Sequence, residues 1–244
     1  MIVNAHVHFG LLWGPLENWP VGYTADELLK DMDRDGVDKA VIVPFIQNYD
    51  NEFMAKSAKE HPDRLIAFAM INPWRHINKK DDIKRYVDLS IKGIKLKSPL
   101  EGFNLNDDML LGEIYEACIE NEMPILVHTG DDVSCTPLQC EEMVNKYPEI
   151  TLILAHAGFR NLADEAVRVA KRNKQIILDQ TAATSQQLRD ALREIEPERI
   201  VFGSDSPFMD ERVELEKCRV VIDDVHARKL IMGETILRIL NIKF

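Results

Sequence analysis

Two stretches of the chain repeat one pattern: residues 125–130 read Ile-Leu-Val-His-Thr-Gly, and residues 153–158 read Ile-Leu-Ala-His-Ala-Gly. Each stretch is a short apolar run that ends on a histidine, followed two positions later by a glycine. Short, nearly continuous apolar runs are typical of strands in a parallel sheet, because helices cover both faces of such a sheet. The offset between the two stretches is the length of one strand and one helix. They predict successive strands of a parallel sheet, each with a histidine at its end.

Similar runs recur along the chain, and amphipathic charged segments with helical periodicity separate them. The eight expected strands are residues 2–7, 39–43, 65–71, 93–96, 124–127, 151–155, 175–178 and 199–202. Eight strand–helix units in about 250 residues are typical of a closed (β/α)₈ barrel, the TIM barrel. An open doubly wound sheet often carries a glycine-rich first turn, whereas the first turn here reads His8-Phe9-Gly10-Leu11. We therefore expect an α/β protein with a single barrel domain over residues 1–244.

The charge of the chain disfavours two classes of partner. Lysine and arginine total 30 against 41 acidic residues, so the formal net charge is −11. A nucleic-acid binder, or a protein that docks on anionic membrane, needs a basic face. No apolar segment approaches the roughly 20 residues of a bilayer span, and the first residues lack a signal-peptide pattern. We expect a cytoplasmic protein with four reduced cysteines, no nucleic-acid or membrane partner, and a homodimer as the default assembly.

Ionisable side chains follow several of the expected strands. His6 and His8 lie two apart on the first strand, so both side chains project on one face. Alone, this pair is equally consistent with two hydrogen-bonded structural histidines. However, His128, His156 and Asp205 also end expected strands, and in a barrel these ends form one small ring of positions where function is expected. Imidazoles and a carboxylate are a ligand set for Zn²⁺, Mn²⁺ or Fe²⁺.

Burial gives a physical reason for a cation at this ring. Ionisable groups that terminate apolar strands are costly to bury unpaired, and a shared cation removes that cost. The remaining histidines, His61, His76 and His226, stand in loop-like or helix-end contexts, and we expect them at the surface.

At these residues the chain resembles the amidohydrolase superfamily, in its amidohydrolase-related branch of metal-dependent barrels. The branch includes hydrolases, lactonases and non-oxidative decarboxylases such as aminocarboxymuconate-semialdehyde decarboxylase. The resemblance covers essentially the whole chain and rests on Asn4-Ala5-His6-Val7-His8, Gly93-Ile94-Lys95-Leu96, Leu126-Val127-His128-Thr129-Gly130, Leu154-Ala155-His156-Ala157-Gly158, Phe202-Gly203-Ser204-Asp205-Ser206-Pro207 and the closing segment 231–240.

The resemblance implies a role for each strand-end residue. His6, His8 and His128 would be metal ligands, and Asp205 would ligate the metal weakly or act as general base toward its activated water. His156 would contact the substrate or that water. The implied cofactor is one divalent transition metal, Zn²⁺ first, with Mn²⁺ or Fe²⁺ open.

Two lysines share a face of the fourth expected strand. Lys95 and Lys97 both have the parity to point into the barrel mouth. Some relatives carry a carboxylated lysine here that bridges two metals, and many members of the branch have a histidine where this chain has Lys97. We expect one metal, with Lys95 as a cation that binds a substrate carboxylate, and leave carboxylation and a second metal open. One of the two lysines could instead extend to solvent over apolar neighbours.

The long early loop of residues 9–23 supplies Trp13 and Trp19 as substrate-binding candidates, with packing against the barrel rim as the equal alternative. The leading hypothesis is an enzyme that hydrolyses a C–N or C–O bond in a small amide, ester or lactone, with metal-activated water and Asp205 as base. The alternatives are non-oxidative decarboxylation of an aromatic or enol acid, and a non-catalytic binding barrel.

Overall fold

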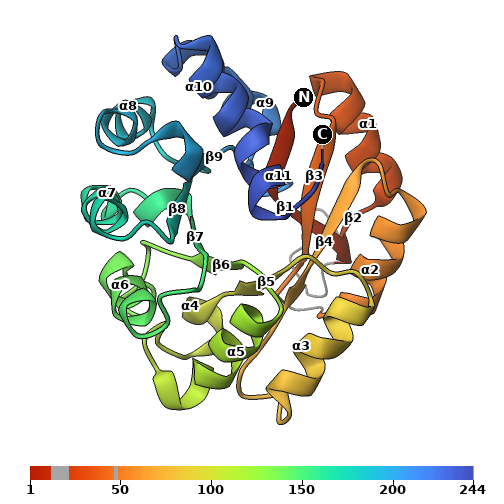
Figure 1. Ribbon diagram of the computed structural model, residues 1–244. Helices are drawn as coiled ribbons and strands as arrows, with labels where there is room; N and C mark the ends of the chain where they lie inside the picture. Colours follow the sequence, from red (N-terminus) through yellow and green to blue (C-terminus); the bar gives the residue numbers. More distant parts are fainter. Residues whose placement is uncertain (12–21, 47–48, 244) are drawn as a thin grey trace.

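The computed structural model describes residues 1–11, 22–46 and 49–243, and its centre is a curved sheet (Figure 1). In the described residues the sheet has 9 strands in the order β2-β1-β3-β4-β5-β6-β7-β8-β9. β1 and β3 to β9 pair in parallel, and β2 pairs antiparallel with β1. The strands are β1 Val3–Leu11, β2 Gly22–Tyr23, β3 Lys39–Pro44, β4 Leu65–Met70, β5 Gly93–Leu96, β6 Ile125–His128, β7 Leu152–Ala155, β8 Ile176–Asp179 and β9 Ile200–Val201.

Hydrogen bonds between β1 and the segment after β9 close the sheet into a barrel. The Ala5 amide donates to the Phe202 carbonyl (2.9 Å), and the His8 amide donates to the Ser206 carbonyl (2.7 Å). Between them, the Asp205 amide donates to the His6 carbonyl (2.8 Å). This seam between β1 and the segment after β9 completes the expected (β/α)₈ barrel.

Helices surround the barrel as its outer layer (Figure 1). The first is representative: Thr24 and Glu27 form a capping box at its start, and Gly36 ends it in the left-handed region (φ 75°). The helices are α1 Ala25–Asp35, α2 Asn51–Glu60, α3 Lys79–Asp88, α4 Ser98–Glu101, α5 Asp108–Glu120, α6 Pro137–Lys146, α7 Ala163–Arg172, α8 Ser185–Glu194, α9 Glu211–Val221, α10 Val225–Lys229 and α11 Thr235–Ile239, with short turns η1 His156–Gly158, η2 Pro197–Arg199 and η3 Leu230–Glu234.

The strands are apolar on both faces because they serve two cores. On β3, Val41 and Val43 belong to a cluster inside the barrel, whereas Ala40 and Ile42 belong to the larger cluster between the sheet and the helices. Leu237 of α11 packs into the inner cluster. This double burial explains why the sequence shows continuous apolar runs rather than alternation.

Most strand boundaries differ from the sequence-based expectation by one residue, and the end of β1 differs most. β1 continues to Leu11 because Gly10 and Leu11 pair with β2, so the ends of the expected 9–23 loop are strand. Arg199 belongs to η2 rather than to the last strand. Trp13 and Trp19 lie outside the described residues.

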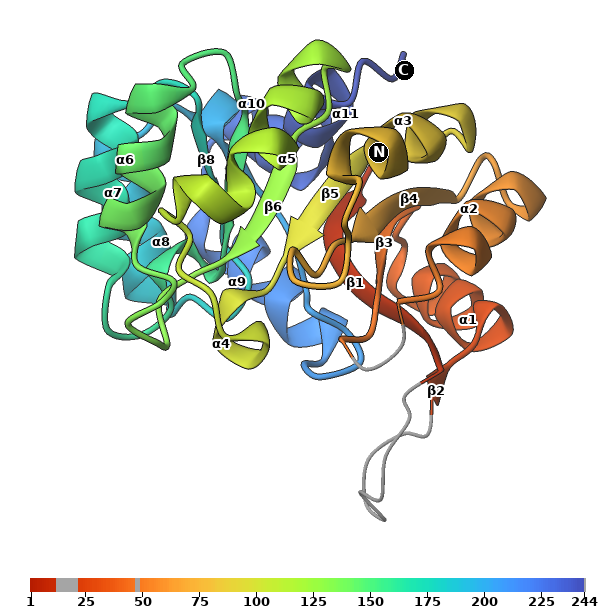
Figure 2. The ribbon, with the colours of Figure 1, turned by 90° about the horizontal axis from the view of Figure 1, so that it is seen from below.

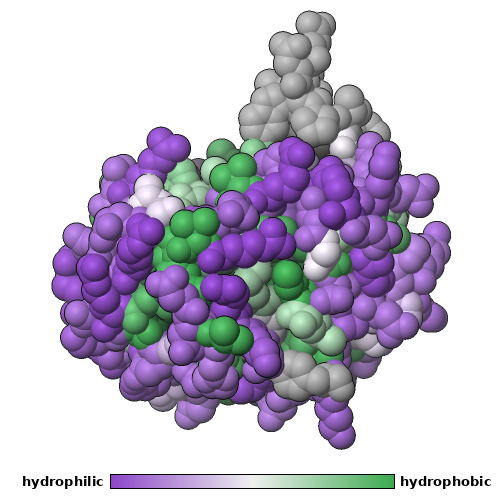
Figure 3. Space-filling view, turned by 90° about the horizontal axis from the view of Figure 1, so that it is seen from above, coloured by the Kyte–Doolittle hydropathy of each residue, from purple (hydrophilic) through white to green (hydrophobic). Residues whose placement is uncertain are grey.

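The catalytic end of such a barrel is the one where the strands finish. β2 and α4 lie at that end, below the strands in Figure 2. Figure 3 shows the molecule from above relative to Figure 1. Most of the visible surface is hydrophilic, and small hydrophobic patches lie between the hydrophilic residues. Among the described residues, none of the helices combines the length and apolar character of a bilayer span.

Candidate metal centre

A bulge in β1 directs both histidines of the first strand toward the barrel axis. Val3 and Ala5 belong to the inner core, whereas Val7 belongs to the outer one, so the parity of the strand changes between them. The pairing with β3 is irregular at this point, between Asn4 and Val7. A bulge inserts one residue and re-aims the side chains that follow it. Without it, His6 and His8 would face the helices.

The far nitrogen of each imidazole is occupied by a hydrogen bond. His6 Nδ1 lies 3.0 Å from Asp179 Oδ2, and His8 Nδ1 lies 3.1 Å from the Pro44 carbonyl oxygen. Since both partners are acceptors, each Nδ1 carries the proton and each Nε2 presents a lone pair. Asp179 is itself fixed by Thr181, whose hydroxyl (2.6 Å) and amide (3.0 Å) both donate to its Oδ1.

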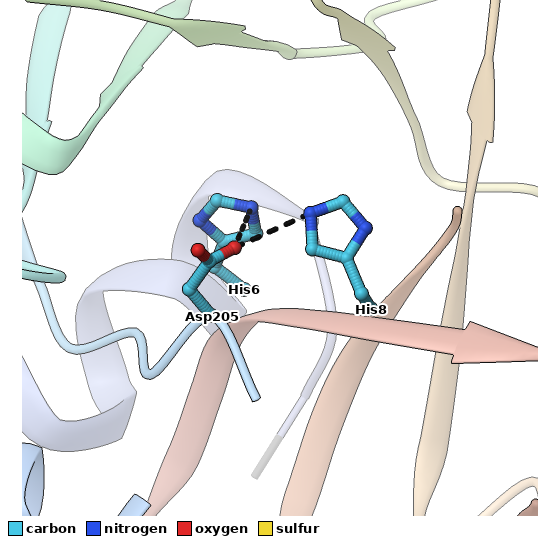
Figure 4. Close-up of side chains that lie close together, drawn as sticks. All are labelled: His6, His8 and Asp205. Carbon is cyan, nitrogen blue, oxygen red and sulfur yellow. Dashed lines mark ion pairs between the residues drawn. The ribbon is translucent and has the colours of Figure 1, made fainter. Parts of the chain in front are cut away.

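The two Nε2 atoms converge on one carboxylate oxygen (Figure 4). Asp205 Oδ1 lies 3.4 Å from His6 Nε2 and 3.3 Å from His8 Nε2. The potential ligand atoms of these three residues all lie within 4.8 Å of one another. Two of these buried atoms, His8 Nε2 and Asp205 Oδ1, make no hydrogen bond in the described chain. Three acceptors that face one another repel, and a divalent cation with N/O preference fits between them.

Burial keeps the imidazoles neutral, as metal ligation requires. Burial is the largest cause that lowers the pKa of His6 and His8, and the ammonium groups of Lys95 and Lys97 lower both further. Burial alone would raise the pKa of Asp205, but the adjacent imidazoles outweigh it and hold that pKa well below its usual range. The centre therefore presents neutral nitrogens and a charged carboxylate at neutral pH.

Lys95 reaches the centre from β5. Its side chain is fully buried, and its Nζ lies 3.1 Å from His6 Nε2. Burial, with a smaller contribution from the nearby Lys97 ammonium, lowers the pKa of Lys95 to about 7. Lys97 is half-buried at the position that precedes α4, so the two lysines differ in environment although they share parity.

His128 and His156 form a second imidazole pair beside the first. His128 Nε2 lies 2.8 Å from Asp131 Oδ1, and its Nδ1 lies 3.2 Å from His156 Nε2. The His156 ring centroid is 5.3 Å from that of His6, and His156 Nδ1 is buried without a hydrogen bond in the described residues. His128 is thus near the centre, but its nitrogens are engaged by Asp131 and His156 rather than grouped with the ligand atoms around Asp205.

Sequence reasoning overlooked Asp179 and Asp131. Asp179 is the last residue of β8, directly after the apolar run, so the rule that singled out His128 and Asp205 would also have found it. Asp131 carries no comparable signal because its contact depends on how the loop after β6 folds. His61 and His76 are half-buried, His226 is exposed, and the four cysteines are buried free thiols.

Two aromatic rings line the mouth next to His8. Phe45 stacks on the His8 ring at 5.6 Å, and Phe208 meets that ring edge-on at 5.1 Å. Both follow strand ends, so they belong to the loops that shape a pocket in this fold.

The family model described as amidohydrolase matches residues 3–242, nearly the whole chain. The chain belongs to the amidohydrolase family. It is therefore an enzyme of a metal-dependent barrel family that includes both hydrolases and decarboxylases. A comparison with curated protein sequences gives no match.

Solved structures of three proteins superpose on this amidohydrolase along nearly its full length. One is 5-carboxyvanillate decarboxylase from Sphingomonas paucimobilis, with 13% identity, coverage of 99% of both chains and a TM-score of 0.82. A second 5-carboxyvanillate decarboxylase, from Novosphingobium aromaticivorans and complexed with manganese, has 14% identity, coverage of 99% and 96%, and a TM-score of 0.77. A putative 2-pyrone-4,6-dicarboxylic acid hydrolase from Pseudomonas putida has 14% identity, coverage of 100% and 98%, and a TM-score of 0.80. At these identities the likeness establishes the fold.

Proposed function

We propose that this amidohydrolase hydrolyses a C–N or C–O bond in a small amide, ester or lactone. The observation that carries the proposal is the position of Asp205 Oδ1, 3.4 and 3.3 Å from the unprotonated nitrogens of His6 and His8. A carboxylate held there can accept a proton from water and pass it to a leaving nitrogen or oxygen.

His6, His8 and Asp205 would hold one divalent cation, with His128 as a further ligand if its ring turns away from Asp131. When bound, the cation supplies Lewis acidity that activates water near neutral pH. The imidazole and carboxylate donors suit Zn²⁺ first and also Mn²⁺, the metal in the Novosphingobium complex.

The other residues of the centre would serve the substrate. His156 Nδ1 is buried without a hydrogen bond in the described residues. Because His128 Nε2 donates to Asp131, His128 Nδ1 accepts from His156 Nε2, so His156 Nδ1 is an acceptor that can bind a hydroxyl or amide proton of the substrate or a water molecule. Lys95, and Lys97 at the edge of the mouth, provide positive charge for a substrate carboxylate. Phe45 and Phe208 would exclude water on the side of His8.

Non-oxidative decarboxylation of an aromatic or enol acid is the second candidate, and the fully buried Lys95 favours it. A cation beside His6 would bind the carboxylate that leaves as carbon dioxide, and His156 Nδ1 would take up a proton from water and pass it to the carbon. Two of the three superposed structures are decarboxylases.

A substrate panel separates the two reactions. The metal-loaded protein is offered lactones, amides and phenolic acids, while hydrolysis products and released carbon dioxide are both measured. Hydrolysis without carbon dioxide supports the proposal, whereas carbon dioxide release from phenolic acids replaces it with the second candidate.

The Asp205→Asn variant tests the proposed base in the same panel. Asparagine keeps an oxygen ligand but cannot accept the proton, so we expect turnover to fall at least 100-fold while most of the bound metal is retained. Turnover equal to that of the wild type would remove Asp205 as base.

A further inference from the structure

A buried hydrogen-bond network lies directly behind the metal centre, at the seam that closes the barrel. Asn4, on β1, is fully buried, and its Oδ1 accepts the amide protons of Ser204 (3.0 Å) and His6 (3.2 Å). Its Nδ2 donates to Ser204 Oγ (2.6 Å) and to Glu211 Oε2 (2.5 Å). All four hydrogen-bonding positions of this amide are therefore used, which fixes its orientation.

The network continues around Asp205 in one direction. Ser204 Oγ accepts from Asn4, so its proton points to Ser206 Oγ at 2.8 Å, and Ser206 Oγ donates to the Met209 carbonyl (3.2 Å). The Ser206 amide also donates to Ser204 Oγ (3.2 Å). Asp205, between these two serines, has a φ of 58°, a left-handed conformation that a non-glycine residue adopts only when its surroundings hold it.

Glu211 is the anchor of this network. It lies in the first turn of α9 and is buried, and within the described chain the only hydrogen bond of its carboxylate is the one from Asn4. Its other oxygen, Oε1, is buried without a partner in the same residues. A buried carboxylate with one hydrogen bond costs free energy, so stability alone does not account for it.

Removal of the Glu211 acceptor would free one Nδ2 proton of Asn4 in a buried site. The amide would then no longer be held in the orientation that clamps the Ser204 amide to β1, and Asp205 would lose part of its support. We propose that Glu211, through Asn4 and Ser204, is a positioning residue that holds Asp205 at its place between His6 and His8. This inference rests on the metal centre of the proposed function.

Glu211 can accept the hydrogen bond from Asn4 whether its carboxyl group is charged or neutral. Burial raises the pKa of Glu211 to about 7, the Asn4 hydrogen bond and Arg34 lower it, and the carboxylates of Asp35 and Asp31 raise it. Whether charged or neutral, Oε2 remains an acceptor for the Asn4 amide. A glutamine at this position keeps an acceptor as well.

Cobalt(II) provides a readout other than turnover, because its visible absorption reports the geometry of its ligands. Wild type, Glu211→Ala, Glu211→Gln, Ser204→Ala and the control Glu214→Gln are stripped of metal and titrated with Co²⁺. Glu214 is also buried on α9, but its carboxylate pairs with Lys217 rather than with Asn4. Each variant is also melted, so that loss of fold is measured separately.

We expect the Glu211→Ala and Ser204→Ala variants to bind Co²⁺ about 10-fold more weakly than the wild type, because loss of a residue that supports a metal ligand typically lowers affinity by about this factor. Both variants should also show an altered visible spectrum. Glu211→Gln should restore the wild-type spectrum, and Glu214→Gln should lower the melting temperature without changing the spectrum. Wild-type affinity and spectrum in Ser204→Ala and in Glu211→Ala would overturn the inference. A wild type that binds no Co²⁺ would overturn the metal centre and this inference together.

Discussion

His6 and His8, the histidines of the proposed metal centre, are each held through the nitrogen that faces away from Asp205. For His6 the holding group is the Asp179 carboxylate, and for His8 it is a backbone carbonyl of β3. A carboxylate that accepts from a ligand imidazole fixes the ring, selects the tautomer and raises the basicity of the opposite nitrogen. The positions of the proposed ligand atoms are therefore set by residues on other strands as much as by β1.

The Asp179→Asn substitution tests this support. The amide removes the negative charge behind His6 and can present a donor to Nδ1, so we expect metal affinity to fall 10- to 100-fold, roughly the range for such partners. Titration of the stripped protein with Zn²⁺ measures the change. Asp190→Asn, on α8, where the carboxylate pairs with Arg193, is the matched control. Equal affinity in the two variants would contradict the role of Asp179.

Glu101 gives the protein a pH-dependent stability that is independent of the metal ligands. Both of its oxygens are buried without a hydrogen bond in the described residues, and burial raises the pKa of Glu101 to about 8. Because the folded state binds this proton more tightly than the unfolded state, stability falls as the pH rises from the ordinary carboxyl pKa through 8.

For Glu101→Gln we expect the difference in unfolding free energy from the wild type to change by about 3 kcal/mol between pH 5 and pH 9, in favour of the variant at the higher pH. Urea unfolding at both pH values measures it. Glu113→Gln, at an exposed position of α5, should show no such trend. If the difference in unfolding free energy between Glu101→Gln and the wild type were the same at pH 5 and pH 9, the pKa of Glu101 would not be raised in the folded protein.

The residues of the centre were predictable where chemistry and strand position coincide. His6 and His8 lie on β1 and Asp205 lies in the segment after β9, and the structure brings them together. The contacts of His128 with Asp131 and of Asn4 with Glu211 depend on how loops and helices pack. The periodicity of apolar residues does not predict that packing. The sequence predicts Lys95 as a pocket cation, which stays a prediction, and its distance from His6 could come only from coordinates.

At the scale of elements, β1 shows what a pattern can and cannot predict. The apolar run of this strand was visible in the sequence, but its bulge was not, because Val3, Ala5 and Val7 are all apolar and do not reveal which face they occupy. The bulge decides that the histidines face the axis. β2 is only two residues long and had no sequence signal.

The loops after β6 and β7 are locked together by a glycine contact. Gly130 has a φ of 100°, and a Cβ there would lie 2.0 Å from the carbonyl carbon of Gly158. His128 ends β6 directly before the first loop, and His156 begins the second. We expect Gly130→Ala to lower stability by about 3 kcal/mol and turnover at least 10-fold, because one loop must move.

Gly36→Ala is the matched control for this contact. Gly36 also has a positive φ of 75°, but a Cβ there would meet nothing within 4 Å. It should lose only about 1 kcal/mol, the cost of the backbone conformation, and keep full turnover. Equal losses in denaturant unfolding of the two variants would show that the contact with Gly158 is unimportant.

At the scale of the whole molecule, the eight-fold alternation of strands and helices was sufficient to predict the barrel. Closure of the barrel depends on the seam between β1 and the segment after β9. The three proposed ligand residues lie on the two sides of this seam. A cation held by His6, His8 and Asp205 would therefore join the first and last strands of the barrel, and metal binding should stabilise the entire fold.

Metal addition should raise the melting temperature of the stripped protein. At a free Zn²⁺ concentration of about 100 times Kd the gain is about 2.7 kcal/mol, or roughly 5–10 °C for a chain of this size. Calorimetry of the wild type and of a His6→Ala, His8→Ala double variant checks it, and the double variant should show no rise. A rise of the same size in both would locate the stabilising metal elsewhere.

Anomalous diffraction from crystals grown with Zn²⁺, recorded at the zinc absorption edge, tests the metal centre most directly. We predict one strong peak per chain, about 2.0–2.2 Å from His6 Nε2, His8 Nε2 and Asp205 Oδ1. A strong peak only at other residues, or none in a crystal whose protein contains zinc by elemental analysis, would contradict the account.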